Sequence, residues 1–108
     1  MLELPIKRKW FDMIVSGEKK EEYREIKPYW TKRFGNYFIG TYVDKTITFR
    51  NGYGENRSSI KCTCLLREGQ GKEEWGAESN KEYYVLEILE ILEVSNVNES
   101  ETNEKRYK

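Results

Sequence analysis

The chain has 108 residues, of which 37% are hydrophobic and 35% are charged, and its formal net charge is zero. This length provides for one hydrophobic core, so we expect a single domain. No stretch approaches the roughly 18 apolar residues of a membrane helix, and the first residues lack a signal-peptide layout, so we expect a cytoplasmic protein with no membrane partner. The sequence contains no histidine, which excludes a Ser-His-Asp triad and removes the commonest metal ligand.

The first quarter of the chain predicts a strand, a helix and a second strand. Residues 2–6 are apolar around Pro5 and indicate a short strand or edge segment. In residues 7–16 the apolar side chains recur at helical spacing, which predicts a helix with one apolar face. Gly17 stands where a helix C-cap glycine belongs. Residues 19–26 follow as a strand whose many charges favour an edge or the wall of a cleft.

The middle of the chain predicts a second short helix and a hairpin. Residues 28–34 begin with proline, which suits the first turn of a helix, and Gly35 is expected to close that helix. Residues 46–50 have the composition of a β-strand. The Asn-Gly pair at 51–52 is a hairpin turn signal.

The last part of the chain predicts two more strands and a tail. Residues 58–67 alternate as a strand, and the Gly-Gln-Gly of 69–71 is expected to break it. Residues 83–94 combine β-favouring side chains with a glutamate at every third position. A long strand with a bulge or break is the favoured interpretation there, and an amphipathic helix is the alternative. Residues 95–108 are polar and predict a disordered tail.

Together these elements predict an α+β, mainly β domain over residues 1–94. We expect a partly closed β-barrel of five to six mostly antiparallel strands with one or two short helices packed on it. Cys62 and Cys64 lie two residues apart in a predicted strand. A disulfide between them would be strained and two thiols cannot complete a zinc site, so we expect reduced, semi-buried thiols. The sequence has no Walker loop, Gly-rich dinucleotide fingerprint or metal cluster, so we expect no metal or cofactor.

The charges are unevenly distributed along the chain. Residues 1–72 carry 15 Lys and Arg against 9 Asp and Glu, whereas residues 73–108 carry 4 against 10. This distribution favours a basic working face on the first two-thirds of the chain. Chance clustering of solvated charges is the alternative.

The segment from Gly17 to Arg24 concentrates the chemistry of the sequence. Alternate side chains of a strand share a face and two residues span about 6.6 Å, so Glu22 and Arg24 are expected to point the same way. Parity does not fix the side of Lys19. Arg24 can bind a phosphate or a base edge, and Glu22 can accept hydrogen bonds from an amine. In an enzyme, Lys19 and Glu22 would be the catalytic acid–base pair. An internal ion pair that closes the barrel mouth is the structural alternative.

Aromatic and basic residues interleave after this segment. Aromatic rings stack on bases while Lys and Arg hold phosphates, which is the pattern of sites for single-stranded nucleic acid. Packing of the aromatic rings at the end of the barrel is the alternative. The candidate ligand-binding residues here are Trp30, Arg50 and Tyr53.

The segment Ile14–Arg24 resembles the signature of the ASCH domain, a member of the PUA-like superfamily. That signature runs Gly-x-Lys-x-x-x-x-Arg, often with Glu two residues before the Arg. The preceding helix and the following residues look like the phage-associated and bacterial members, and the likeness is clearest over residues 4–34. The matching residues, which are candidate ligand-binding residues, are Gly17, Lys19, Glu22 and Arg24.

The resemblance implies a PUA-like β-barrel with a cleft beside the motif and a ligand that is RNA, a nucleotide or a nucleoside. One branch of the family hydrolyses the amide of an acetylated cytidine with a lysine, a threonine and a separate glutamate. Lys19 matches that lysine, but Glu22 occupies the threonine position, so the nucleophile of that branch is missing here. Another member is a ribonuclease.

Three functions are compatible with these residues. The leading hypothesis is a small RNA- or nucleotide-binding module. The second is a hydrolase that acts on RNA or a modified nucleoside, as a ribonuclease or an amidohydrolase-like enzyme. The third is an accessory protein-interaction domain whose acidic residues 73–108 meet a basic partner.

Overall fold

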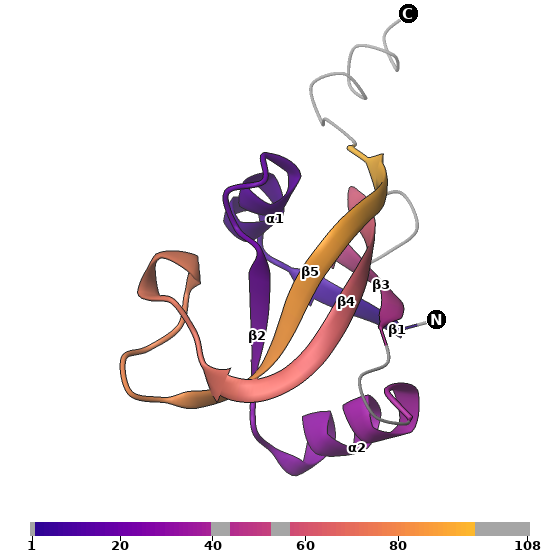
Figure 1. The fold of residues 1–108 in the computed structure, drawn as a ribbon. Helices are drawn as coiled ribbons and strands as arrows, with labels where there is room; N and C mark the ends of the chain where they lie inside the picture. Colours follow the sequence, from indigo (N-terminus) through magenta and orange to yellow (C-terminus); the bar gives the residue numbers. More distant parts are fainter. Residues whose placement is uncertain (1, 40–43, 53–56, 97–108) are drawn as a thin grey trace, which may run out of the picture.

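The structure is a computed structural model that describes residues 2–39, 44–52 and 57–96. It contains a single five-stranded sheet with two short α-helices at opposite ends of it (Figure 1). The elements are, in chain order, β1 (Leu2–Ile6), α1 (Arg8–Val15), β2 (Glu21–Glu25), α2 (Pro28–Tyr37), β3 (Lys45–Asn51), β4 (Ser59–Gln70), a 3-10 turn (Glu73–Trp75) and β5 (Glu82–Ser95).

The strands lie in the order β1-β3-β4-β5-β2. β1 pairs with β3 in parallel, and the other neighbours are antiparallel. The sheet curls into a half-barrel, with the long β4 and β5 strongly bent (Figure 1). The predicted α+β, mainly β, partly closed barrel is therefore confirmed. β1 and β2 are the two edges of the sheet, as their proline and their charges led us to expect.

One main core fills the inside of the curled sheet. The two helices each contribute fully buried side chains to it, Phe11 and Ile14 from α1 and Phe34 from α2. The ring of Phe34 contacts the rings of Trp30 and Tyr84, with centroids 5.4 Å apart in both cases. The strand residues of this core are Leu2, Leu4, Ile6, Ile47, Phe49, Ile60, Cys62, Cys64, Tyr84 and Leu86.

The helix α2 is longer than predicted. It runs to Tyr37, so Gly35 lies inside the helix, and the prediction that Gly35 closes it was wrong. Residues 36 and 37 therefore also belong to the helix. The helix ends at the C-cap Phe38, whose N–H donates to the carbonyl of Phe34 at 2.8 Å. A hydrophobic face that continues past the glycine outweighs its low helix propensity.

The hairpin between β3 and β4 forms, but its connection is longer than two residues. Gly52 has a φ of +86°, and the N–H of Asn51 donates to the carbonyl of Ser58 at 2.8 Å. The candidate ligand residue Tyr53 falls outside the described residues. At its other end β4 continues through Gly69, which pairs with Tyr83, so the expected break at 69–71 comes after Gln70.

The strand β5 resolves the ambiguity of residues 83–94 in favour of a long strand with bulges. Its register against β4 shifts twice, and each shift leaves one extra residue on β5, Leu89 and then Leu92. As a result Glu87, Glu90 and Glu93 pair with alternate residues of β4 and share one face of the sheet. A repeat of three residues therefore serves as a strand pattern. The polar tail predicted for residues 95–108 lies outside the described residues from residue 97 onward, and Ser95 still belongs to β5.

The two cysteines are free and fully buried on the core face of β4. Their sulfur atoms are 3.6 Å apart, a contact distance and not a covalent bond. Contact with Cys62, together with burial, raises the pKa of Cys64 far above its usual value. The thiols are unbridged, as expected, but they are fully buried and not semi-buried. No helix in the described part of the chain is both long and apolar enough to cross a membrane.

The position of Gly35 inside α2 can be tested by comparing two glycine substitutions. A methyl group at Gly35 meets no atom within 4 Å, and Gly35 has helical backbone angles. Gly35→Ala should therefore raise the free energy of unfolding by about 0.5–1 kcal/mol. Gly17→Ala should lower it by roughly 1 kcal/mol, because Gly17 has a φ of +85°. Urea denaturation measures both, and a destabilised Gly35→Ala protein would place the end of α2 at residue 35.

Candidate functional site

The turn between α1 and β2 brings Lys19 back beneath the helix. Ser16 caps α1, and Gly17 follows in the left-handed region, where only glycine is relaxed. The N–H of Lys19 then donates to the carbonyl of Met13 at 2.9 Å. Gly17 itself is exposed and lines neither of the cavities described below, so its part in the site is to direct the chain.

Lys19 is the most deeply buried charged residue of the described chain, with 1% of its surface exposed. Its Nζ donates to the carbonyl of Trp75 at 2.5 Å and lies 3.2 Å from Oε1 of Glu22. The same ammonium lies 4.8 Å from the ring centre of Trp10 and 4.9 Å from that of Tyr23. Two hydrogen-bond acceptors and two aromatic faces thus replace the water that burial removes.

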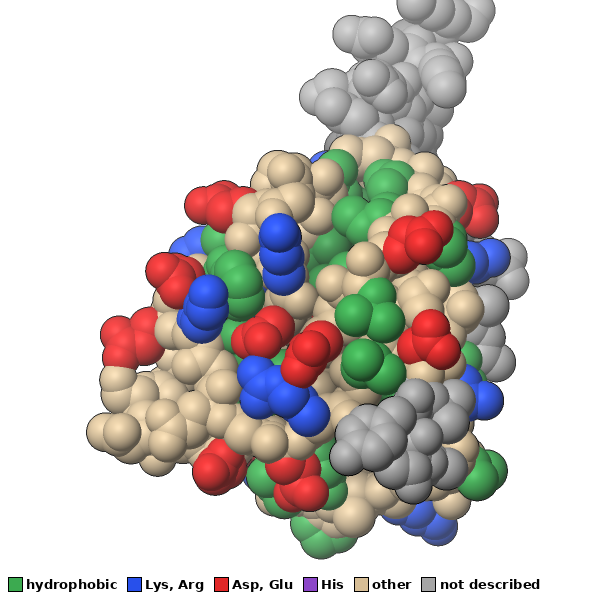
Figure 2. Space-filling view, viewed as in Figure 1, with side chains coloured by type: hydrophobic (Ala, Val, Ile, Leu, Met, Phe, Trp, Pro, Cys, Tyr) green, Lys and Arg blue, Asp and Glu red, His purple; other side chains and the backbone are tan. Residues whose placement is uncertain are grey.

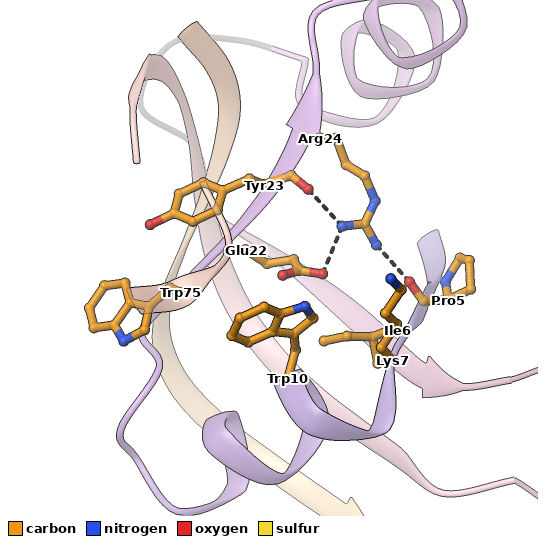
Figure 3. A pocket seen from close by; sticks show the side chains of 9 residues that line it. Pro5, Ile6, Lys7, Trp10, Glu22, Tyr23, Arg24 and Trp75 are labelled. Atoms are coloured by element: carbon orange, nitrogen blue, oxygen red, sulfur yellow. Dashed lines mark hydrogen bonds and ion pairs between the residues drawn. The ribbon is translucent and has the colours of Figure 1, made fainter. Parts of the chain in front are cut away.

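Glu22 and Arg24 share one face of β2, as strand parity predicted. Oε2 of Glu22 accepts from Nη1 of Arg24 at 2.7 Å, while its other oxygen faces Lys19. Nη1 of Arg24 also donates to the carbonyl of Tyr23 at 2.8 Å, and Nη2 donates to the carbonyl of Pro5 at 2.7 Å (Figure 3). Because Pro5 belongs to β1, Arg24 bridges the two edges of the sheet.

The electrostatics of this ion-pair chain are set by burial. Removal from water lowers the pKa of Lys19 below its usual value, and the charge of Glu22 and its hydrogen bond oppose that change. The three ionised groups carry a net charge of +1. The ion pair considered as a structural alternative is therefore present, and it leaves an excess of positive charge at the site.

A cavity of about 270 Å³ opens beside the ion pairs (Figure 3). It combines aromatic surface, positive charge and one carboxylate. Lys19 does not line this cavity and acts on it through Glu22 and through the backbone of Trp75. The lining residues are Pro5, Ile6, Lys7, Trp10, Glu22, Tyr23, Arg24, Trp75 and Gly76.

The segment between β4 and β5 supplies one wall of this cavity, and it lies beside β2 (Figure 1). The N–H of Lys72 donates to the hydroxyl of Tyr23 at 2.9 Å, which ties the segment to the strand. Gly76 has a φ of +102°, and an added Cβ there would lie 2.9 Å from the Trp10 ring. Close approach of this segment to α1 therefore needs glycine at position 76, and it delivers the carbonyl of Trp75 to Lys19.

A second cavity, of about 380 Å³, contains the other predicted ligand residues that the structure describes. Trp30 from α2 and Arg50 from β3 both line it, as does Pro5, which is common to the two cavities. Arg50 is engaged with Glu3, Nη2 to Oε1 at 2.8 Å. Trp30 and Arg50 thus lie together in the second cavity, apart from the lining of the first.

Of the nine residues that line the first cavity, sequence reasoning predicted only Glu22 and Arg24 as site residues. Trp10 was placed only on the apolar face of the predicted helix, and Pro5, Lys7 and Trp75 were not predicted to contact a ligand. Trp10 does pack on the core, but its ring also contacts Lys19. Neither helical spacing nor motif matching identifies Pro5, Lys7 and Trp75. These residues approach the motif only because the sheet curls and because the segment after β4 lies close to it.

The basic charges of residues 1–72 and the acidic charges of residues 73–108 are interleaved in the sheet. Arg67 on β4 pairs with Glu87 on β5 at 2.6 Å, and Lys61 pairs with Glu93 at 3.5 Å. Figure 2 shows acidic and basic side chains lying close together on the face seen in Figure 1, with hydrophobic side chains between them. This side of the molecule is therefore not the uniformly basic face that the charge distribution favoured. Recognition at the cavities would rest on the charged groups that line them.

Comparisons with protein-family models, with curated proteins and with solved structures gave no match. The resemblance to the ASCH domain therefore rests on the motif residues and stays a prediction. Among residues 2–39, 44–52 and 57–96 there is no group of three or more Cys, Asp or Glu side chains arranged to hold a metal ion.

The ion-pair chain predicts a pH-dependent loss of stability in Glu22→Gln. Removing one partner of a buried pair leaves Lys19 uncompensated, so the free energy of unfolding at pH 7 should fall by on the order of 3 kcal/mol. Glu22 raises the pKa of Lys19, so without it that pKa falls further below 10.5. Between the lowered pKa of Lys19 in the folded variant and 10.5, the unfolded state binds one more proton than the folded state. The stability of the variant therefore rises with pH in this range, until Lys19 loses its proton in both states near pH 10.5.

Urea denaturation at pH 7 and pH 10 measures this effect as the difference between variant and wild type. Glu25→Gln is the matched control, because Glu25 lies on the same strand but forms exposed pairs with Lys27 and Lys81. It should change stability little at either pH. A Glu22→Gln deficit that is as large at pH 10 as at pH 7 would contradict the role given to Lys19.

Proposed function

We propose that this protein is an RNA- or nucleotide-binding module of the ASCH type, whose ligand occupies the first cavity. The observation that carries the proposal is the composition of the cavity walls. Two tryptophans and a tyrosine lie beside Lys7 and Arg24, and a single carboxylate faces them. Aromatic faces stack on bases, and cations bind phosphates, so this combination suits a nucleotide better than an apolar ligand.

Arg24 has donors available for a ligand. A guanidinium carries five N–H groups, and the contacts in the described chain use three, to Glu22, Tyr23 and Pro5. Its planar fork is already oriented by these contacts, so little rotamer entropy remains to be lost on binding. Lys7 is exposed at the same cavity and adds a second, flexible charge.

The size of the cavity supports a small ligand at this position. Its volume of about 270 Å³ lies just under the usual range for ligand pockets, about 300–1,000 Å³. One nucleoside, or one nucleotide with its phosphate outside, is the corresponding ligand. The carboxylate of Glu22 would accept from an exocyclic amine of the base.

A hydrolase is the second candidate, favoured by the burial of Lys19 and by the lowering of its pKa. Both oxygens of Glu22 are engaged by cations, however, and Lys19 reaches the cavity only through Glu22 and Trp75. That arrangement suits electrostatic positioning better than proton transfer. Product formed from RNA or from an acylated nucleoside by the wild type, and lost in Lys19→Met, would favour the hydrolase.

Binding should depend on the ring of Trp75. Trp75→Ala removes the ring but keeps the carbonyl that accepts from Lys19, so the fold should persist. Loss of one stacking surface should weaken nucleotide binding by about tenfold, within the 1–3 kcal/mol typical of base–aromatic stacking. Isothermal titration calorimetry with the four nucleoside monophosphates measures this change, and unchanged thermal unfolding is the control. Equal affinities in both proteins would remove Trp75 from the site.

Binding of an RNA strand should also depend on the charge of Lys7. Lys7→Ala should make the affinity for an oligouridylate of six residues less dependent on salt, with the slope of log K against log salt smaller by roughly 0.7. Lys20→Ala is the matched control, because Lys20 is also exposed but lines neither cavity. Identical salt slopes for the two variants would show that Lys7 meets no phosphate.

A further inference from the structure

The second cavity lies next to the first and has its own aromatic and cationic walls. Pro5 lines both cavities, so they share a boundary. Its remaining walls come from β1, from α2, from Arg50 on β3 and from Gly52. The volume of about 380 Å³ is larger than that of the first cavity and lies within the usual range for small ligands.

The α2 wall of this cavity is an aromatic and cationic cluster. The rings of Tyr29 and Trp30 meet edge to face, with centroids 4.8 Å apart. Arg33 lies 5.6 Å from both ring centres, and its Nη1 donates to the hydroxyl of Tyr29 at 3.1 Å. Trp30 is fixed from behind by stacking on the buried Phe34, with centroids 5.4 Å apart. Tyr29, in contrast, is 60% exposed.

The opposite wall carries a charge pair that a nucleotide can use. Glu3 and Arg50 form an ion pair between β1 and β3, and only one donor of Arg50 is engaged in it. Together with Arg33 the cavity has a net charge of +1. Arg50 can hold a phosphate through its other N–H groups, and Glu3 can accept from the amine of a base.

Arg24 connects the two cavities. Its guanidinium lines the first cavity, donates to the carbonyl of the shared Pro5 at 2.7 Å and lies 5.4 Å from the ring centre of Trp30 in the second. A cation therefore stands at the boundary, where the backbone of a strand that entered both cavities would carry its phosphate.

We infer that the second cavity binds the next nucleotide of the same strand, so that the ligand is single-stranded RNA of at least two nucleotides and not a free nucleotide. The first cavity holds one base, Arg24 contacts the phosphate between the two nucleotides, and the face of Tyr29 stacks on the second base. This inference rests on the proposed function, since it extends a strand from the first cavity.

The test compares mononucleotides with dinucleotides by isothermal titration calorimetry. Uridylate and adenylate are titrated alone and as the dinucleotides UpU and ApA, each with a 5′ phosphate. The wild type should bind a dinucleotide on the order of tenfold more tightly than the mononucleotide. Tyr29→Ala and Arg33→Ala should each abolish most of this gain while leaving mononucleotide affinity unchanged. Tyr29→Phe should retain the gain, because it keeps the ring.

Lys32→Ala is the matched control for charge, since Lys32 is exposed on the same helix and lines neither cavity. It should retain the gain. A dinucleotide that binds no tighter than the mononucleotide overturns the inference, as does a gain that survives in both Tyr29→Ala and Arg33→Ala. Both outcomes leave the proposed function intact if mononucleotides bind. Absence of binding by every mononucleotide and dinucleotide would overturn the proposed function and the inference together.

Discussion

The structure depends on one buried carboxylate that holds two cations. Glu22 contacts Lys19 through one oxygen and Arg24 through the other, and Arg24 continues to the carbonyl of Pro5. Glu22 and Arg24 lie on β2 and Pro5 lies on β1, so these side-chain contacts join the two edges of the sheet. In the described residues no backbone pairing closes the sheet between those edges. A side-chain bridge leaves space beside it, which continuous backbone pairing would have filled. The first cavity, which is lined by residues of both edge strands, therefore follows from the way the half-barrel is held together.

Much of the fold could be read from the sequence, and the exceptions have identifiable physical causes. Strand parity gave the common face of Glu22 and Arg24, and proline and charge marked the edge strands. The glutamates of β5 were ambiguous because their spacing of three fits a helix, whereas a bulge at Leu89 and another at Leu92 gives the same spacing in a strand. Bulges depend on the partner strand, so one segment read alone cannot reveal them. The predicted end of α2 at Gly35 was wrong for a similar reason, because the packing of α2 on the core overrides the low helix propensity of glycine.

The candidate site was predictable where it is local and not where it is assembled. Glu22 and Arg24 are neighbours on one strand, and their contact follows from geometry alone. The partner of Lys19, the carbonyl of Trp75, is 56 residues away, and it is a backbone atom that no motif identifies. Burial of Lys19 depends on that contact and on the Trp10 ring, so the sequence offered no sign that the lysine would stand behind the cavity.

The two roles of the motif constrain each other. Arg24 bridges the sheet edges and also lines the first cavity, so a change there should affect both stability and the proposed ligand binding. Lys19 and Glu22 also cannot be changed singly without loss of stability, because either one alone would be an unpaired buried charge. Exposed residues that line the cavities, such as Lys7 and Tyr29, take no part in these buried ion pairs, so they can be substituted without breaking them. We therefore expect the motif to define the shape of the first cavity, while exposed side chains such as Lys7 and Tyr29 determine which ligand the proposed site selects.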